Sequence, residues 1–219
     1  MLTRRVQPPE ERIGLTRANA FTYTPRVPSH PEIAYEMLAR SADAIRTSLS
    51  LTDQVVEVAE RIADALEAGG KLLVCGNGGS AGDAQHFAGE LMGRFQVHGR
   101  KARPAVALTT DSSVLTGIAN DYGFDDIFAN QVVGLARTGD ILVGISTSGS
   151  STNVLRAFDA APQGVLRVAL TGPGGALAER ADLALRVQAE GIAPIQAAHI
   201  SIIHAICAVL EARFATTDG

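Results

Sequence analysis

The sequence predicts an α/β fold in which helices cover both faces of a five-stranded, mainly parallel sheet. Three observations support this prediction. Short apolar runs alternate with helical patterns after residue 70, loops rich in glycine or serine follow two of those runs, and no internal repeat or sign of a second domain interrupts the alternation. The chain has 219 residues, of which 46% are hydrophobic and 19% charged, enough for one such domain with a sizeable core.

The first third of the chain is predicted to be an extension followed by two helices. Residues 1–30 contain proline and arginine without hydrophobic periodicity, so we expect an N-terminal extension to a single domain over residues 31–219. They lack the apolar core of a signal peptide. Helical patterns follow over residues 31–48 and 52–68. In the second, apolar residues share one face, Thr52 is placed to cap the start, and Gly69-Gly70 ends it.

Strand and helix patterns then alternate to the end of the chain. Apolar runs predict strands over residues 71–75, 105–108, 140–145, 166–170 and 183–187. Helices are expected over residues 81–93, 112–119, 125–136 and 194–214. A further helix is expected from the end of the serine loop at residue 151 to residue 160, and a short one between the fourth and fifth strands. The helix over residues 194–214 has Pro194 at its start, where proline is tolerated.

Charge and cysteine usage exclude several classes of function. The formal net charge of −4 argues against a broad nucleic-acid surface, and no apolar run approaches the roughly 18 residues that span a membrane, so neither partner is expected. Cys75 and Cys207 lack a C-x-x-C spacing, which fits a reduced, cytoplasmic protein. Cys75 lies beside a loop and could be reactive, but we interpret it as a small buried residue at a strand end.

A glycine loop follows the first predicted strand. Gly76-Asn77-Gly78-Gly79-Ser80-Ala81 leads into a helix, and glycines let backbone N–H groups approach an anion at a helix N-terminus. The same letters fit the dinucleotide pattern G-x-G-x-x-A. That pattern also requires an acidic residue about 20 positions on, whereas Asp111 lies 30 positions past Ala81. We therefore favour a phosphate-binding loop over a dinucleotide site.

A second candidate loop follows the third predicted strand. Ser146-Thr147-Ser148-Gly149-Ser150-Ser151 offers five hydroxyls in six positions before a helix. Hydroxyl and amide groups can hold a phosphate without lysine or arginine. A solvated turn that caps the next helix is the alternative, but ligands bind at the carboxyl ends of strands in open α/β sheets, so phosphate binding is favoured.

Two segments about 110 residues apart carry metal-ligand or acid/base side chains at helical spacing. His86 and Glu90 are four residues apart, and Gln196 and His204 are eight apart, so each pair shares one face of a helix. Together they could bind a divalent metal or act as an acid/base pair. His199 lies on a less compatible face and is interpreted as structural, and His98 is given no role.

The same segments resemble the signature of the bacterial phosphoheptose isomerases. The resemblance rests on residues 76–91, on Ala119-Asn120-Asp121-Tyr122-Gly123, on residues 144–149 and on the terminal pattern that contains Gln196, His199 and His204. It runs from about residue 35 to 214. It implies a sugar-isomerase (SIS) domain, a three-layer αβα sandwich whose N-terminal helices pack in an oligomer.

The resemblance also implies an activity and a site. The family converts sedoheptulose 7-phosphate to a D-glycero-D-heptose 7-phosphate (manno or its C2 epimer) through an enediol, in a cytoplasmic homotetramer. It implies that Glu90 is the catalytic base and His204 the acid. One Zn²⁺ per subunit would be held by His86, Glu90, Gln196 and His204. Substrate contacts are implied for Asn77, Gly78, Gly79, Ser80, Asp111, Ser146, Thr147, Ser148, Ser151 and Gln196.

Two departures and two alternatives accompany this interpretation. Many relatives carry arginine just before Ile-Gln, whereas this chain has Ala193-Pro194, which bears on the identity of the heptose. The first 30 residues exceed the usual family length. The alternatives are an SIS adaptor that binds a replication initiator without catalysis, whose members tend to lack the four metal or acid/base residues, and an isomerase of another phosphosugar.

Overall fold

The structure is a computed structural model that describes residues 28–217, so residues 1–27 of the predicted extension lie outside the described residues. Within them, five strands form one sheet in the order β2-β1-β3-β4-β5, and every neighbouring pair is parallel. The strands are β1 (Leu72–Gly76), β2 (Ala105–Ala107), β3 (Ile141–Ser146), β4 (Leu166–Thr171) and β5 (Leu183–Arg186). The predicted parallel sheet is confirmed.

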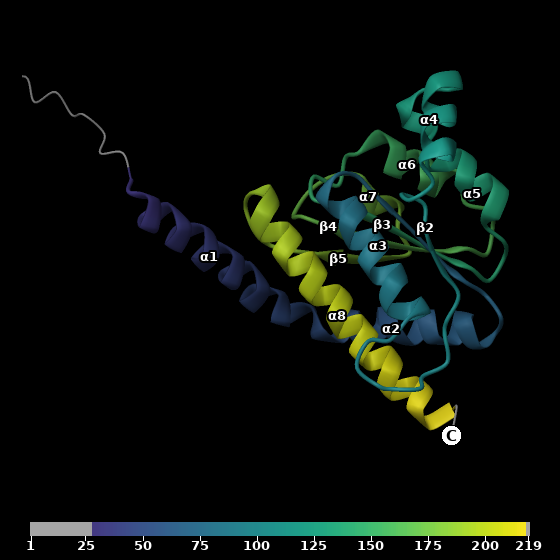
Figure 1. Cartoon of the computed structure of the whole chain (residues 1–219), viewed down its shortest axis with the longest axis horizontal. Helices are drawn as coiled ribbons and strands as arrows, with labels where there is room; N and C mark the ends of the chain where they lie inside the picture. Colours follow the sequence, from purple (N-terminus) through teal and green to yellow (C-terminus); the bar gives the residue numbers. More distant parts are fainter. Residues whose placement is uncertain (1–27, 218–219) are drawn as a thin grey trace, which may run out of the picture.

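Two helical layers cover the sheet (Figure 1). One layer contains α1 (His30–Thr47), α2 (Thr52–Glu67), α3 (Gly79–Met92) and α8 (Ile192–Thr217), with a 3₁₀ turn, η1 (Ser48–Leu51), between the first two. The other contains α4 (Ser112–Asp121), the 3₁₀ turn η2 (Phe124–Asp126), α5 (Ala129–Leu135), α6 (Thr152–Asp159) and α7 (Leu177–Arg180). The result is the predicted αβα sandwich.

The apolar strands explain this arrangement, because successive side chains of a strand point to opposite faces. In β1, Leu72 and Val74 pack with α2, α3 and α8, whereas Leu73 and Cys75 pack with α5 and α6. All four are fully buried. A strand buried on both faces is continuously apolar, as the sequence of β1 is.

The strand order reverses direction at β1 and β3. The chain passes from β1 outward to β2, then returns to β3 on the other side of β1 and continues to β4 and β5. Gly76 pairs with Ile145 at the carboxyl ends of these two central strands. Loops that leave neighbouring strands in opposite directions leave a crevice between them, which is where open α/β sheets bind ligands.

Two helix predictions need correction. The helix predicted over residues 125–136 is instead η2 followed by α5, because Ile127 and Phe128 are both buried between them and the chain bends there to bury them. The last helix, α8, is longer than predicted. Within its segment Ile192–Ala215, an 18-residue window has a mean hydropathy of 1.7, so α8 is long and apolar enough to cross a membrane by length and composition, contrary to our prediction that no apolar run approaches that length. This is weak support for a span, because 44% of the window is buried and α8 packs into the core.

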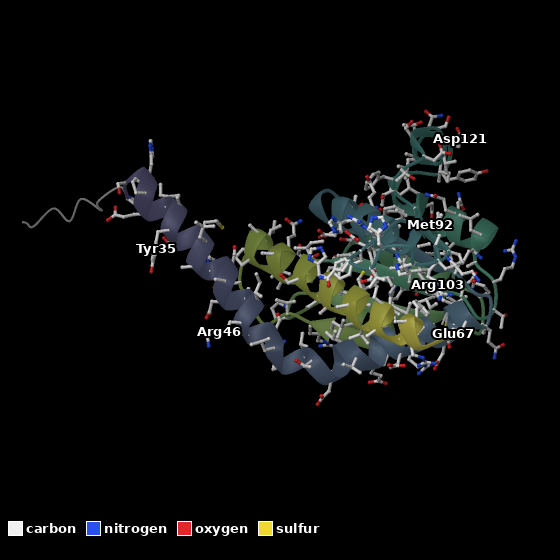
Figure 2. All side chains as sticks on the ribbon, turned by 60° about the horizontal axis from the view of Figure 1, so that its bottom comes forward. Tyr35, Arg46, Glu67, Met92, Arg103 and Asp121 are labelled. Carbon is white, nitrogen blue, oxygen red and sulfur yellow. The ribbon has the colours of Figure 1, made fainter. Side chains whose placement is uncertain are left out.

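The N-terminal helix α1 leaves the body of the domain. The C-terminal half of α1 crosses α8, while the N-terminal half of α1 projects outward as an arm, as Figure 1 shows. Figure 2 shows Tyr35 and Arg46 along α1. Ala44 is the buried residue of α1. Exposed apolar side chains follow the arm and the turn after it, at Ile33, Tyr35, Met37, Leu38, Ile45 and Leu49.

Candidate active site

The glycine loop after β1 and the hydroxyl loop after β3 lie side by side at the carboxyl edge of the sheet. Two amide side chains join them: Asn77 Nδ2 donates to Asn153 Oδ1 (2.8 Å), and Asn153 Nδ2 donates to Asn77 Oδ1 (2.9 Å). Asn153 lies in the first turn of α6 and is 2% exposed. Asn153 was not predicted as a site residue, because its partner Asn77 lies 76 positions earlier in the chain.

The hydroxyl loop gathers its side chains around Ser146. The Ser146 Oγ lies 2.9 Å from the Ser151 Oγ and 3.4 Å from the Ser148 Oγ, and Ser146 is 3% exposed. Gly149 has a φ of +64°, and a Cβ there would lie 2.3 Å from the carbonyl oxygen of Gly174. Only glycine fits this turn. Three hydroxyls therefore converge at the start of α6, where an anion is favoured.

The glycine loop brings a residue of α8 close to the start of α3. Gly78 precedes α3 with a φ of +56°. A Cβ at Gly79 would lie 2.3 Å from Gln196 Nε2, so the Gln196 amide packs directly against the backbone of Gly79. Gln196 therefore contacts the glycine loop, although Gly79 and Gln196 are 117 positions apart in the chain.

Two turns along α3, the imidazole and carboxylate side chains meet. His86 Nε2 lies 3.0 Å from Glu90 Oε1 and 2.9 Å from His204 Nε2. The rings of His86 and His204 are 5.0 Å apart between centroids, and the Phe95 ring lies 5.7 Å from that of His204. His86 is 42% exposed and Glu90 is 20% exposed, so solvent and a ligand can reach them.

These three side chains have the geometry of a metal site. One ligand atom from each of His86, Glu90 and His204 lies within 4.8 Å of the other two. Two nitrogens bound to one tetrahedral zinc stand roughly 3.3 Å apart, given Zn–N bonds of about 2.0–2.1 Å. The separations of 2.9 and 3.0 Å are close to this value. The nitrogen and carboxylate donors are also those that zinc prefers.

A second carboxyl group lies beside this cluster. Asp83 is three residues before His86, and its Oδ2 is buried without a hydrogen-bond partner among the described residues. Burial raises the pKa of this carboxyl, and the nearby His86 lowers it by a smaller amount. The site therefore holds two partly buried carboxyl groups on the same helix, Glu90 and Asp83.

Other residues singled out in the sequence lie outside the His86, Glu90 and His204 cluster. Asp111 follows β2 at the same edge of the sheet, where its Oδ1 accepts a hydrogen bond from the Val114 N–H (3.0 Å) and caps α4. His98 lies exposed in the loop after α3. His199 is fully buried, and burial lowers its pKa to about 4, so it is neutral at pH 7, as a structural residue would be. Cys75 is buried as predicted, with its pKa raised to about 12 by burial.

The departure at the start of α8 has a structural counterpart. Pro194 lies in the first turn of α8, beside Arg40 and Asp43 of α1 in one small cleft. The Arg40 Nη2 donates to the carbonyl oxygen of Glu190 (2.9 Å). A guanidinium and a carboxylate from α1 thus lie next to the segment where the family resemblance leads us to expect an arginine.

Comparison with known proteins identifies the family. The model of the SIS domain matches residues 36–172. A phosphoheptose isomerase from Geotalea daltonii is 50% identical over 165 residues, which cover 74% of this chain and 85% of that protein. The chain belongs to the phosphoheptose isomerase family. Solved structures of phosphoheptose isomerases agree with this assignment.

The phosphoheptose isomerase from Neisseria gonorrhoeae is 44% identical with a TM-score of 0.79, over 84% of this chain and all of that one. The enzyme from Francisella tularensis is 37% identical with a TM-score of 0.75, over 82% and 98%. Phosphoheptose isomerases thus share the SIS fold described above over most of this chain, in agreement with the predicted family.

Proposed function

We propose that this chain converts sedoheptulose 7-phosphate to a D-glycero-D-heptose 7-phosphate (manno or its C2 epimer) for heptose biosynthesis. By its family it is an aldose–ketose isomerase. One observation carries the proposal: His86 and Glu90 of α3, the helix that follows the glycine loop, meet His204 of α8, with ligand atoms within 4.8 Å of one another. A catalytic group from each helix could therefore contact one substrate.

The chemistry assigns a role to each of two groups. Isomerisation moves the carbonyl from C2 to C1, which requires a proton to leave C1 and a proton to return to C2 through an enediol. We assign the proton transfer on carbon to the Glu90 carboxylate, and the polarisation and protonation of the carbonyl oxygen to the His204 imidazole. Each group of this kind contributes about 10²–10⁴-fold to the rate.

The two loops would hold the substrate. Phosphate would bind to the hydroxyls of Ser146, Ser148 and Ser151 at the start of α6; the last two lie 3.4 and 2.9 Å from the Ser146 hydroxyl. Binding at this remote end supplies orientation, not chemistry. The proposed substrate-contact set is Asn77, Gly78, Gly79, Ser80, Asp111, Ser146, Thr147, Ser148, Ser151 and Gln196.

We further propose that His86, Glu90, Gln196 and His204 hold one Zn²⁺ per subunit. The three converging donors His86, Glu90 and His204 support this, and Gln196, whose amide packs against Gly79 at the start of α3, is included from the family resemblance. A bound zinc ion would act as a Lewis acid that stabilises charge on the enediolate oxygens.

The projecting helix α1 supports a homotetramer. Six apolar side chains of α1 and η1 are between 38% and 76% exposed in the single chain, and α1 makes little of the core. Six exposed apolar side chains on one projecting segment fit an interface with other copies of this chain. We propose that copies of this chain cover it, and that the protein acts in the cytoplasm, where Cys75 and Cys207 would stay reduced. We expect neither nucleic acid nor a membrane as a partner.

The test is an incubation with sedoheptulose 7-phosphate and with a panel of other ketose phosphates, with and without a zinc chelator. We expect conversion of sedoheptulose 7-phosphate to be fastest and to fall after chelation. Absence of conversion would contradict the isomerase and favour the adaptor. Faster conversion of another sugar phosphate would contradict the heptose assignment, and full activity after chelation would contradict a catalytic zinc.

A further inference from the structure

The loop after α3 folds back and places a buried guanidinium at the end of that helix. The Arg100 side chain is 7% exposed. Its Nη2 donates to the carbonyl oxygens of Glu90 (2.5 Å), Leu91 (3.1 Å) and Gly93 (2.9 Å). The last carbonyls of a helix have no N–H partner within the helix, so Arg100 takes the place of a C-terminal cap for α3.

A buried carboxylate of α8 faces Arg100. Glu211 Oε1 lies 3.4 Å from Arg100 Nε, as an ion pair, and the Glu211 side chain is 8% exposed. The same oxygen accepts hydrogen bonds from the backbone N–H groups of Gln96 and Val97 (3.1 Å each). Glu211 therefore binds both Arg100 and the backbone of the loop that carries Arg100, and it fixes that loop to α8.

This pair lies directly behind the candidate active site. Glu90 is in the last turn of α3, and Arg100 donates to the backbone carbonyl oxygen of Glu90. Glu211 is seven residues after His204, two turns along the same face of α8. Glu90, Arg100, Cys207 and Glu211 line one small cavity, together with Phe95, whose ring also contacts the His204 ring. The pair thus joins the end of α3 that carries Glu90 to the helix that carries His204.

We propose that Arg100 and Glu211 are positioning residues, which hold Glu90 and His204 at the separation that isomerisation requires. This inference rests on the roles proposed above for Glu90 and His204. The last turn of a helix frays readily, and Glu90 lies in such a turn. A shift of about 1 Å in a catalytic group can cost about 10²-fold in rate, so anchoring this turn has a direct catalytic consequence.

The competing explanation is that the Arg100–Glu211 pair only stabilises the fold. A charge-neutral double variant separates this stabilising role from the positioning role. Replacing both partners of a buried ion pair with uncharged residues is often neutral for stability, whereas removing one partner leaves a buried charge unpaired. In Arg100→Met/Glu211→Gln, the new amide oxygen can still accept from the backbone of Gln96 and Val97. The carbonyls of Glu90 and Gly93 then lose the Arg100 donor, whereas the carbonyl of Leu91 keeps the N–H of Arg103 (3.0 Å).

The experiment compares melting temperature, kcat and KM for four variants with those of the wild-type enzyme. Arg100→Met should lower both melting temperature and kcat. The double variant should recover most of the melting temperature, keep KM within about 3-fold, and still lose about 30-fold or more in kcat. The matched control is Arg213→Met. Arg213 is on the same helix and pairs with Glu60, Asp64 and Glu67 of α2, remote from the site, so its kcat should stay within about 2-fold.

The fourth variant, Glu90→Gln, separates failure of the positioning role from failure of the proposed site. If Glu90→Gln is inactive and the double variant regains wild-type kcat along with its melting temperature, the pair serves stability and the positioning role is overturned. If Glu90→Gln keeps normal turnover, the proposed catalytic site is wrong, and the positioning role fails with it.

Discussion

The hydroxyl loop and the α3–α8 helix pair form two halves of the candidate site and are built in different ways. The loop is local: Ser146, Ser148 and Ser151 converge within six residues at the end of one strand. The helix pair is assembled across the fold, because His86 and His204 are 118 residues apart and meet only through packing. One half offers hydroxyls and a helix start, whereas the other offers imidazole and carboxylate groups. We infer that binding and chemistry are separable, so changes in the loop should act on KM and changes in the helix pair on kcat.

The largest effect should follow from Glu90→Gln in the helix pair. Loss of the carboxylate should reduce kcat by about 10²–10⁴-fold, with KM little changed, because the phosphate contacts are elsewhere. Steady-state kinetics with sedoheptulose 7-phosphate measure this, with Glu57→Gln, an exposed carboxylate of α2, as the control. A variant that retained kcat but lost substrate affinity would reverse the assignment of the two halves.

A pH titration should show that α8 carries a buried weak base. His199 has a pKa lowered to about 4 by burial, whereas an unfolded histidine titrates near 6.5, so between these values the unfolded chain binds more protons. Stability from this residue is therefore lost as the pH falls from about 6.5 towards 4. Between pH 7 and pH 5 the expected loss is about 2 kcal/mol.

Urea unfolding of the metal-free protein and of His199→Leu at both pH values measures this contribution. The difference between the two pH values should be about 2 kcal/mol smaller in the variant. Equal pH dependence in both proteins would mean that His199 is not held neutral by burial.

Ser146→Ala should have a smaller effect than Glu90→Gln, and it should act on KM rather than on kcat. A hydrogen bond to a charged group is worth about 1.5–3 kcal/mol, so we expect KM to rise at least about 10-fold while kcat stays within about 3-fold. Ser150→Ala is the matched control, because Ser150 lies in the same loop but is exposed and bonds its hydroxyl to the backbone of Ser148. A fall in kcat at constant KM would place the loop in the chemistry and remove the distinction.

The smallest expected effect is at the junction of the two halves. A Cβ at Gly79 would lie 2.3 Å from the Gln196 amide, so Gly79→Ala should displace a flexible side chain without unfolding the protein. If Gln196 binds zinc, zinc affinity should fall about 10-fold, as measured by competition with a chromophoric chelator. Gly82→Ala is the control, since nothing lies within 4 Å of its new Cβ. Unchanged affinity in Gly79→Ala would remove Gln196 from the proposed ligand set.

The same contrast explains what could be predicted from sequence. Local patterns predicted all five strands and both loops, because each depends on residues that are adjacent in the chain. Residue types and helical spacing suggested that His86 and Glu90 act together with His204, and the family resemblance assigned a role to each. Contacts that require the chain to fold back on itself, such as Asn77 with Asn153, left no signal at their own positions. The bend before α5 was missed because burial of Ile127 and Phe128 overrides the helical pattern.

The most direct test of the acid/base pair is deuterium exchange in D₂O, followed by NMR. Removal of the C1 proton by Glu90 predicts that wild-type enzyme incorporates deuterium into sedoheptulose 7-phosphate and its product. It predicts that Glu90→Gln incorporates none, and that His204→Gln does so slowly. Exchange at the wild-type rate in Glu90→Gln would show that another group removes the proton.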